Sequence, residues 1–216
     1  MDASCGLDCD AQSRYGLTVS RCFEYSAASQ PASPADLGVI VGPVTELEGG
    51  VKVLPLEYRQ SGQVRMTDYF SLKGGDLLLM RRRFSGAAQS VTYKDSSGAI
   101  AGVSWLKKST QAGESFATSA QADFVNGGSR TSDGTSYKVV TAAPLASPNL
   151  NELKVPLKTF ESGLKLLFEE TPSHGADPRR IFVDGTGFIA FSTYFSPTPG
   201  NTAAQEYKLQ TVRDIG

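Results

Sequence analysis

The chain has 216 residues, of which 40% are hydrophobic and 20% charged, a composition typical of a folded globular protein with a core of its own. Its 21 basic and 22 acidic residues leave a formal net charge of −1, and this balance lacks the basic excess that proteins binding nucleic acid usually carry. No apolar stretch reaches the roughly 20 residues that a membrane-spanning helix needs. Composition therefore excludes wholesale disorder and argues against a nucleic-acid partner.

All three cysteines, Cys5, Cys9 and Cys22, lie close to the N-terminus. Such clustering is typical of a segment that is cross-linked by a disulfide bond in a protein outside the cytoplasm, so we expect one disulfide and one remaining thiol. Three reduced cysteines in a cytosolic protein are the alternative. A zinc site is disfavoured because no fourth ligand stands at a usable spacing.

The first residues carry neither the charged region nor the apolar region of a signal peptide. We expect that a signal peptide has been removed, that the lipidated cysteine of a bacterial lipoprotein stood upstream of Cys5, and that the membrane is reached only through this lost N-terminal lipid anchor. Residues 26–43 are rich in Ala, Ser and Pro and are predicted to be a surface connection. Residues 1–43 are thus expected to form a cysteine-bearing segment and connection, and residues 44–216 a single β domain of the same unit.

From residue 51 onward, short segments of alternating apolar and polar residues follow one another, separated by Gly, Asn or Asp turns. Pro55 indicates an edge or a bulge in the first of them. Asp68 interrupts the apolar side of the second, and Gly74 with Gly75 predicts a hairpin turn into the third. The predicted strands cover residues 51–58, 64–73, 76–80, 91–94, 99–106, 122–124, 137–140, 180–183, 188–195 and 205–210.

Helical patterns are scarce. Ser147 followed by Pro148 offers an N-cap with proline at the first helical position, which predicts a short helix there. Residues 160–168 match both helical and strand spacing, and both interpretations stay open. The predicted fold is mainly β: an antiparallel meander that forms a curved sheet, half-barrel or sandwich, with one or two short helices.

The C-terminal region joins a Gly-x-Gly turn and an apolar strand to a final alternating strand. The residues that carry this pattern are Gly185, Gly187, Phe188, Ile189, Glu206, Tyr207 and Leu209. The arrangement resembles the C-terminal hairpin of β-rich bacterial envelope lipoproteins related to half-barrel carriers of lipids and lipoproteins. The resemblance covers only the end of the chain, and it implies a protein of the periplasm or outer membrane with a concave sheet face for an apolar ligand.

Large apolar residues on the predicted strands are candidates for such a ligand site. They could line a cavity or equally fill the core, and a lone Trp in a strand is usually part of the core. The candidates are Leu78, Met80, Trp105, Phe124, Phe188 and Phe191.

Arg81, Arg82 and Arg83 form the densest basic run and are a candidate contact for an acidic partner or for anionic lipid headgroups. On a strand, alternate members face opposite sides, so only part of the run can form one patch. The competing interpretation is a solvated strand end that discourages edge-to-edge aggregation.

Catalytic patterns are weak. The one histidine, His174, stands in a segment with the composition of an exposed loop, and no glycine loop has the form of a phosphate or dinucleotide site. A hydrolase would need paired carboxylates, for which Asp68, Asp123 and Asp184 are candidates. For Asp68 we expect instead a β-bulge that turns its side chain to the other face of the sheet, or an arginine that pairs with its carboxylate. We predict no enzyme activity, no cofactor and no metal.

Three functions remain. The first is a non-enzymatic extracytoplasmic binding module, an outer-membrane lipoprotein that takes part in an envelope protein assembly. The second is a carrier of lipid or another apolar ligand, and the third is a carboxylate-dependent hydrolase. A carrier needs an open apolar cavity of about 300 Å³ or more, whereas a packed interior leaves the surface as the place of contact with a protein partner.

Overall fold

The computed structural model describes residues 7–85, 89–111, 116–126, 129–131, 136–142, 149–171, 179–193 and 205–215. In these ranges fifteen strands form one sheet in which every strand pairing is antiparallel, accompanied by one α-helix and two 3-10 turns. The predicted mainly β, antiparallel fold with short helices is confirmed. The elements are α1 (Cys9–Arg14), β1 (Arg21–Ala27), β2 (Leu37–Val41), β3 (Thr45–Leu47), η1 (Glu48–Gly50), β4 (Val51–Gln60), β5 (Gln63–Ser71), η2 (Lys73–Gly75), β6 (Leu77–Phe84), β7 (Gln89–Lys94), β8 (Val103–Leu106), β9 (Phe116–Asn126), β10 (Ser129–Thr131), β11 (Ser136–Ala142), β12 (Leu164–Thr171), β13 (Arg179–Val183), β14 (Gly187–Thr193) and β15 (Gln205–Asp214).

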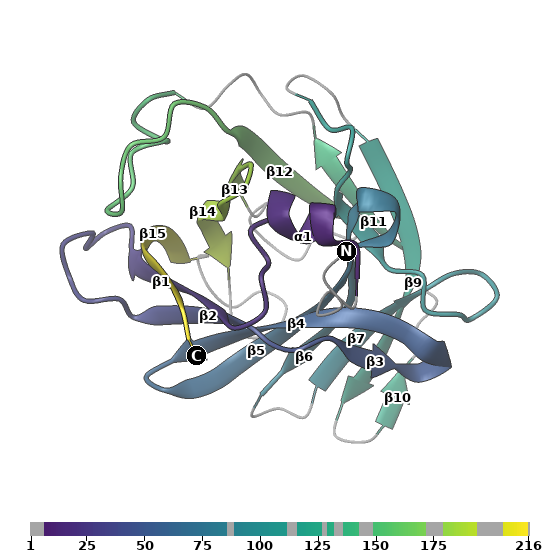
Figure 1. Ribbon diagram of the computed structural model, residues 1–216. Helices are drawn as coiled ribbons and strands as arrows, with labels where there is room; N and C mark the ends of the chain where they lie inside the picture. The colour runs from purple at the N-terminus through teal and green to yellow at the C-terminus, as the bar shows by residue number, and fades with distance from the viewer. Residues whose placement is uncertain are drawn as a thin grey trace.

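The sheet is strongly curved. Hydrogen-bonded neighbours follow the order β10-β9-β11-β12-β13-β14-β15-β1-β2-β4-β5-β6-β7, with β3 beside β4 and β8 beside β6. One half of β9 pairs with β11 and the other half with β7, so β9, which is next to one end of the strand path, also contacts the other end. Figure 1 shows the strands curling around a common interior, with α1 inside the ring in this view. Every second side chain of a strand points into that interior.

The N-terminal segment fills part of the interior. α1 begins after an N-cap, Asp8, whose Oδ1 accepts a hydrogen bond from the backbone N–H of Ala11 at 3.0 Å. Directly after α1, Tyr15 and Leu17 are buried. The Tyr15 hydroxyl donates a hydrogen bond to the carbonyl oxygen of Gly75 at 2.7 Å. The segment is therefore tied to the turn between β5 and β6 and belongs to the core.

The predicted surface connection of residues 26–43 is shorter than its composition indicates. β1 extends to Ala27, and Leu37–Val41 forms β2, in which every second residue is buried. β1 and β2 pair with each other and lie within the sheet. β2 was not predicted because it has only five residues and directly follows a stretch rich in Ala, Ser and Pro.

Residues 160–168, which match both helix and strand spacing, contain the start of a strand. β12 begins at Leu164, and its register places Leu164 opposite Phe182 on β13. The two-residue alternation of a strand places Leu164 and Leu166 on one face, opposite Phe182 and Arg180 of β13. The helix predicted at Ser147 and Pro148 falls outside the described residues.

Pro55 lies within β4 at the point where the neighbours of β4 change. β3 pairs with residues 51–53 of β4, and β2 pairs with residues 56–60. The carbonyl oxygen of Pro55 accepts a hydrogen bond from the N–H of Gly42 at 2.8 Å, so its nitrogen faces the gap between β2 and β3. The missing N–H of proline therefore costs no ladder hydrogen bond there.

The predicted C-terminal hairpin is present. Phe191 on β14 lies opposite Tyr207 on β15. β15 continues beyond the end of β14 to pair with β1, where Tyr25 lies opposite Leu209. The last strand of the chain thus joins the first strand to the rest of the sheet.

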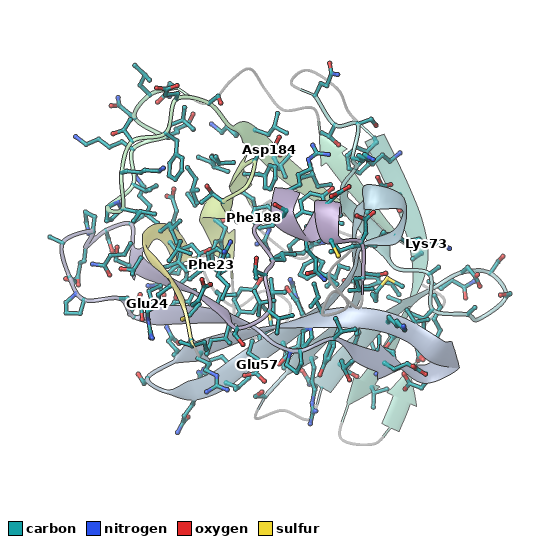
Figure 2. All side chains as sticks on the ribbon, in the orientation of Figure 1. Phe23, Glu24, Glu57, Lys73, Asp184 and Phe188 are labelled. Carbon is teal, nitrogen blue, oxygen red and sulfur yellow. The ribbon has the colours of Figure 1, made fainter. Side chains whose placement is uncertain are left out.

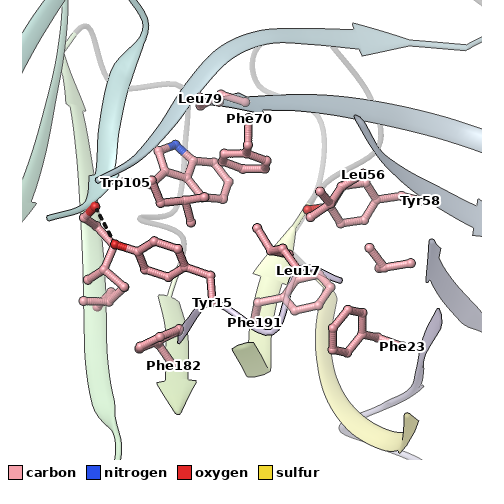
Figure 3. Close-up of a cluster of buried hydrophobic side chains, with 14 of the residues drawn as sticks. Tyr15, Leu17, Phe23, Leu56, Tyr58, Phe70, Leu79, Trp105, Phe182 and Phe191 are labelled. Atoms are coloured by element: carbon pink, nitrogen blue, oxygen red, sulfur yellow. Dashed lines mark hydrogen bonds between the residues drawn. The ribbon is translucent and has the colours of Figure 1, made fainter. Parts of the chain in front are cut away.

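One continuous cluster of apolar side chains fills the interior. Figure 3 shows its centre, where aromatic rings from opposite walls meet. The rings of Phe70 and Trp105 lie 4.9 Å apart in an edge-to-face arrangement, as do those of Tyr25 and Phe191 at the same separation. Such pairs stabilise beyond the area they bury, and they fix the relative positions of the two walls.

A glycine substitution tests the contact between the N-terminal segment and the β13–β14 turn. Gly16 has a φ of +67°, and a Cβ there would lie 2.3 Å from the carbonyl oxygen of Thr186. Gly185 has a φ of +72°, but its Cβ would have no atom within 4 Å. Both Gly→Ala changes strain the backbone by about 1–2 kcal/mol. We expect Gly16→Ala to lower the free energy of unfolding by about 1–3 kcal/mol more than Gly185→Ala, because it also overpacks. Urea unfolding measures both, and equal losses would show that the contact is loose.

Candidate functional site

A buried ion pair occupies the interior face of β5 and β6. Asp68 lies directly opposite Arg82 in the strand register. The guanidinium of Arg82 donates two hydrogen bonds to the carboxylate of Asp68, at 2.7 and 2.8 Å, and Asp68 is 0% exposed. The bidentate geometry makes this a strong charge-assisted pair. The arginine partner expected for Asp68 is present, whereas the alternative, a bulge that shifts its side, is not: the register shift after Tyr69 leaves the extra residue, Met80, on β6, and Asp68 stays on the interior side with Met66 and Phe70.

A second guanidinium reaches the same interior from another wall. Arg180 on β13 is only 3% exposed. Its guanidinium carbon lies 4.1 Å from the ring centroid of Trp105, 5.4 Å from that of Phe191 and 5.5 Å from that of Phe188. The guanidinium carbon of Arg82 lies 5.6 Å from the same Trp105 ring. Both cations therefore contact one indole, and their attraction to its π face offsets part of the loss of hydration.

Tyr58 connects these two charged groups. Burial raises the pKa of Tyr58 above its ordinary value, and the negative charge of Asp68 and a hydrogen bond to that carboxylate raise it further. Burial lowers the pKa of Arg180, whereas a hydrogen bond to Tyr58 acts in the opposite direction. For Arg82, burial favours the neutral form, but the carboxylate of Asp68 outweighs it and the pKa is raised well above its ordinary value. We call Tyr58, Asp68, Arg82 and Arg180 the interior charge cluster.

A small cavity lies beside the interior charge cluster. Its volume is about 20 Å³, which is room for one water-sized particle. Figure 3 shows several of its lining side chains, among them Leu17, Phe23 and Tyr58. The lining residues are Tyr15, Leu17, Phe23, Tyr25, Val39, Leu56, Tyr58, Arg180, Gly187, Phe188 and Phe191.

The six candidate ligand-binding residues have different surroundings. Trp105, Phe188 and Phe191 come together around Arg180, and Phe188 and Phe191 line the cavity. Met80 is buried, and Phe124 is partly buried against the core opposite Val91. Leu78 is half-buried. The six residues therefore contribute mainly to packing, and two of them to a shared cavity wall.

The three arginines of the basic run point in different directions. Arg82 faces the interior. Arg81 pairs with Glu48 at 2.6 Å and donates to the hydroxyl of Thr92 at 2.8 Å. Arg83 is exposed. Strand alternation separates them, as expected, so the run does not form one basic patch.

The candidate carboxylates occupy three separate ion pairs. Asp68 pairs with Arg82 inside the sheet. Asp123 pairs with Lys94 at 2.6 Å, and Asp184 pairs with Arg14 at 3.1 Å. Figure 2 shows Asp184 in the β13–β14 turn. Each carboxylate thus has its own basic partner.

Two of the three cysteines are described. Cys9 is disulfide-bonded, whereas Cys22 is a free, buried thiol whose pKa is raised by burial. Cys5 and His174 fall outside the described residues. Among the residues that the structure does describe, no group of three His, Cys, Asp or Glu side chains could hold a metal ion, and no helix is long and apolar enough to cross a membrane.

No known family model, curated protein or solved structure matches this chain. The resemblance of the C-terminal hairpin to envelope lipoproteins stays a prediction, and function is inferred from the residues of the chain itself.

Sequence reasoning missed Arg180 as a member of the site. It treated the residues around position 180 only as the entry to a strand. A signal was present, because Arg180 stands two residues before Phe182 and therefore on the same face of the strand.

Substitution of Asp68 tests the importance of the buried pair. We expect Asp68→Asn to lower the free energy of unfolding by about 3–5 kcal/mol, because it leaves a buried guanidinium without a counter-charge. Asp184→Asn is the matched control: its side chain is 72% exposed in its pair with Arg14, and the loss should stay below about 1 kcal/mol. Chemical unfolding measures both. The double change Asp68→Leu with Arg82→Leu should recover part of the loss, and comparable losses in the two single variants would contradict the assignment.

Alkaline pH tests the burial of Tyr15. Burial raises the pKa of Tyr15 from 10.0 to about 12. The stability that this shift contributes is complete below pH 10, where the tyrosine is neutral in both states, and is lost as the pH rises towards 12, because only the unfolded chain ionises in that window. The free energy of unfolding should therefore fall by up to about 1.4 kcal/mol per pH unit for this residue. In Tyr15→Phe the fall should be shallower, and an unchanged slope would mean that Tyr15 ionises normally.

Proposed function

We propose that this protein is a non-enzymatic binding module outside the cytoplasm, which contacts another protein in an assembly at the bacterial cell envelope through its outer surface. The observation that carries the proposal is the packed interior. Within the part of the chain that the structure describes, the apolar side chains of the strands and of the N-terminal segment pack into one cluster in the interior. Contact through the surface is the function best supported by such a fold.

A carrier of lipid is less well supported. The cavity beside the interior charge cluster has a volume of about 20 Å³, whereas sites for small organic ligands occupy about 300–1,000 Å³. Its wall also contains the charged Arg180, which an acyl chain would have to desolvate further. The aromatic side chains expected around a ligand instead pack on one another and on Arg180.

A carboxylate-dependent hydrolase is also less well supported. Such an enzyme needs two carboxyl groups on either side of one substrate bond. The three candidate carboxylates lie in separate ion pairs with Arg82, Lys94 and Arg14. None of these three pairs brings two of the acids together.

The disulfide at Cys9 supports a location outside the cytoplasm. Disulfides persist in oxidising compartments and are rare where glutathione and thioredoxin keep thiols reduced. Attachment to the outer membrane by a lipidated cysteine upstream of the chain is part of the proposal.

A loop between β11 and β12 offers a surface for the partner. Leu150 is 70% exposed and Leu157 is 38% exposed. Between and beyond them, Leu153, Val155 and Phe160 are buried and anchor the loop in the core. The backbone N–H of Leu157 donates to the carbonyl oxygen of Leu209 on β15 at 3.2 Å. This segment, residues 149–163, extends as the green loop in Figure 1, and we call it the apolar loop.

Site-specific photocrosslinking in the producing cells tests this function. A photoreactive residue at position 150 or 157 of the apolar loop should give an adduct with one and the same protein. Lys52 is the control position, because it is exposed on β4 and belongs to a different part of the surface. Adducts of equal yield from all three positions, or none from 150 and 157, would contradict the proposal, as would one lipid per chain recovered by solvent extraction of the purified protein.

A further inference from the structure

Three residues form a row across the outer face of β1, β2 and β4. Glu24 lies directly opposite Gly38, and Gly38 lies directly opposite Arg59. The next pair along these strands, Phe23 and Val39, belongs to the core. Because side chains alternate between the two faces of a sheet, the row that contains Gly38 faces away from the interior. We call Glu24, Gly38 and Arg59 the outer row.

The fold of a single chain does not require a glycine at position 38. The φ of Gly38 is outside the left-handed region that favours glycine, and β2 pairs with both neighbouring strands there without a register shift. An added Cβ would have no atom of the described residues within 4 Å. Glycine inside a strand weakens the strand, and where it is retained it often marks a place that another backbone approaches closely. The outer row therefore has the features of a contact surface centred on Gly38.

The charges on the two sides of Gly38 are opposite. Glu24 pairs with Arg213 on β15, and Arg59 pairs with Glu57 on its own strand. In these pairs the side chain of Glu24 is 30% exposed and that of Arg59 is 41% exposed, so each can contact a further charge. Since β1 and β4 are the two direct neighbours of β2, Glu24 and Arg59 lie at similar distances from Gly38. The outer row is therefore complementary in charge to a copy of itself in reversed order.

We propose that the outer row is the centre of an interface between two copies of this chain, related by a two-fold axis that runs along β2 above Gly38. This axis places Glu24 of each copy opposite Arg59 of the other and brings the two Gly38 positions together, in the self-complementary manner of two-fold dimers. An axis across the strands would place Glu24 against Glu24, so charge selects the direction. Ile40, half-buried and two residues beyond Gly38 on the same face, meets its own copy on the axis. The interface does not involve the apolar loop.

Sedimentation velocity of the purified protein tests this interface. A contact centred on one row is smaller than a standard protein interface, so association should be weak and is followed from about 5 to 500 µM. We expect the mean mass to rise with concentration from one chain towards two. Gly38→Val should stay monomeric over the same range, because its side chain separates the two faces. Gly38→Val should also unfold at the same or a higher urea concentration, because a β-branched residue favours a strand and the added Cβ has room in the single chain.

Charge reversal tests the pairing across the axis. Glu24→Arg and Arg59→Glu should each weaken self-association at least about tenfold, because like charges then face each other. An equal mixture of these two variants should dimerise again, because in the mixed pair each arginine at position 24 or 59 faces a glutamate. Such recovery is specific to a two-fold interface in which these two positions meet.

Glu48→Arg is the matched control, because it reverses an exposed glutamate that also pairs with an arginine but lies outside the outer row. It should self-associate like the unchanged protein. An unchanged protein that stays monomeric at every concentration would overturn the proposal. Dimers that persist in Gly38→Val, a mixture of the two charge variants that associates no better than either alone, or loss of association in Glu48→Arg would place the contact elsewhere and would overturn it as well.

Discussion

The carboxylate of Asp68 is withdrawn completely from water, and this constraint organises the interior of the sheet. A buried carboxylate without partners is prohibitively unstable, so the strand opposite must supply a cation at the matching register position. Arg82 does so with two hydrogen bonds. Because the register that joins them also sets which residues of β5 and β6 face inward, a slip by one residue would turn the charges outward and the apolar residues with them. Replacement of such a pair by apolar residues need not destabilise a protein, and its retention here is best understood as a means of specifying register.

Arg180 extends this organisation across the interior. Its guanidinium lies against the rings of Trp105, Phe188 and Phe191. Tyr58 links it to the Asp68–Arg82 pair, because Tyr58 has hydrogen bonds to both Arg180 and Asp68. Residues from β4, β5, β6, β8, β13 and β14 therefore meet in one polar and aromatic centre. The side chains of the surrounding core are apolar, and their packing depends on shape alone. The hydrogen bonds of this centre form only in particular orientations of the groups that they join. The centre fixes how the two walls of the sheet face each other, and a small cavity lies beside it.

Much of this architecture can be predicted from the amino-acid sequence, because strand alternation and turn residues are local signals. Residues 51–106 show them clearly, and the inward position of Asp68 follows from parity alone. The elements that escaped prediction are those whose identity depends on distant partners. α1 is six residues long and is stabilised by its burial against other elements rather than by a periodic pattern. Arg180 stands next to Arg179 at the start of a strand, where a basic pair usually indicates solvent. Strand alternation places Arg180 on the same side as Phe182, but only the pairing of β13 with β12 and β14 shows that this side is buried in the interior.

The pairing of β15 with β1 has a consequence for biosynthesis. Arg21 lies opposite Asp214, so β1 and β15 must meet before the sheet is complete. A polypeptide that emerges from its N-terminus holds β1 with one edge unsatisfied until β15 has appeared, and contacts this distant in sequence form slowly. A chain terminated just before β15 would retain nearly all of its core residues, yet expose unpaired backbone on both β14 and β1. Such edges template pairing between molecules, so premature termination of this chain would produce an aggregating species instead of a slightly shortened domain.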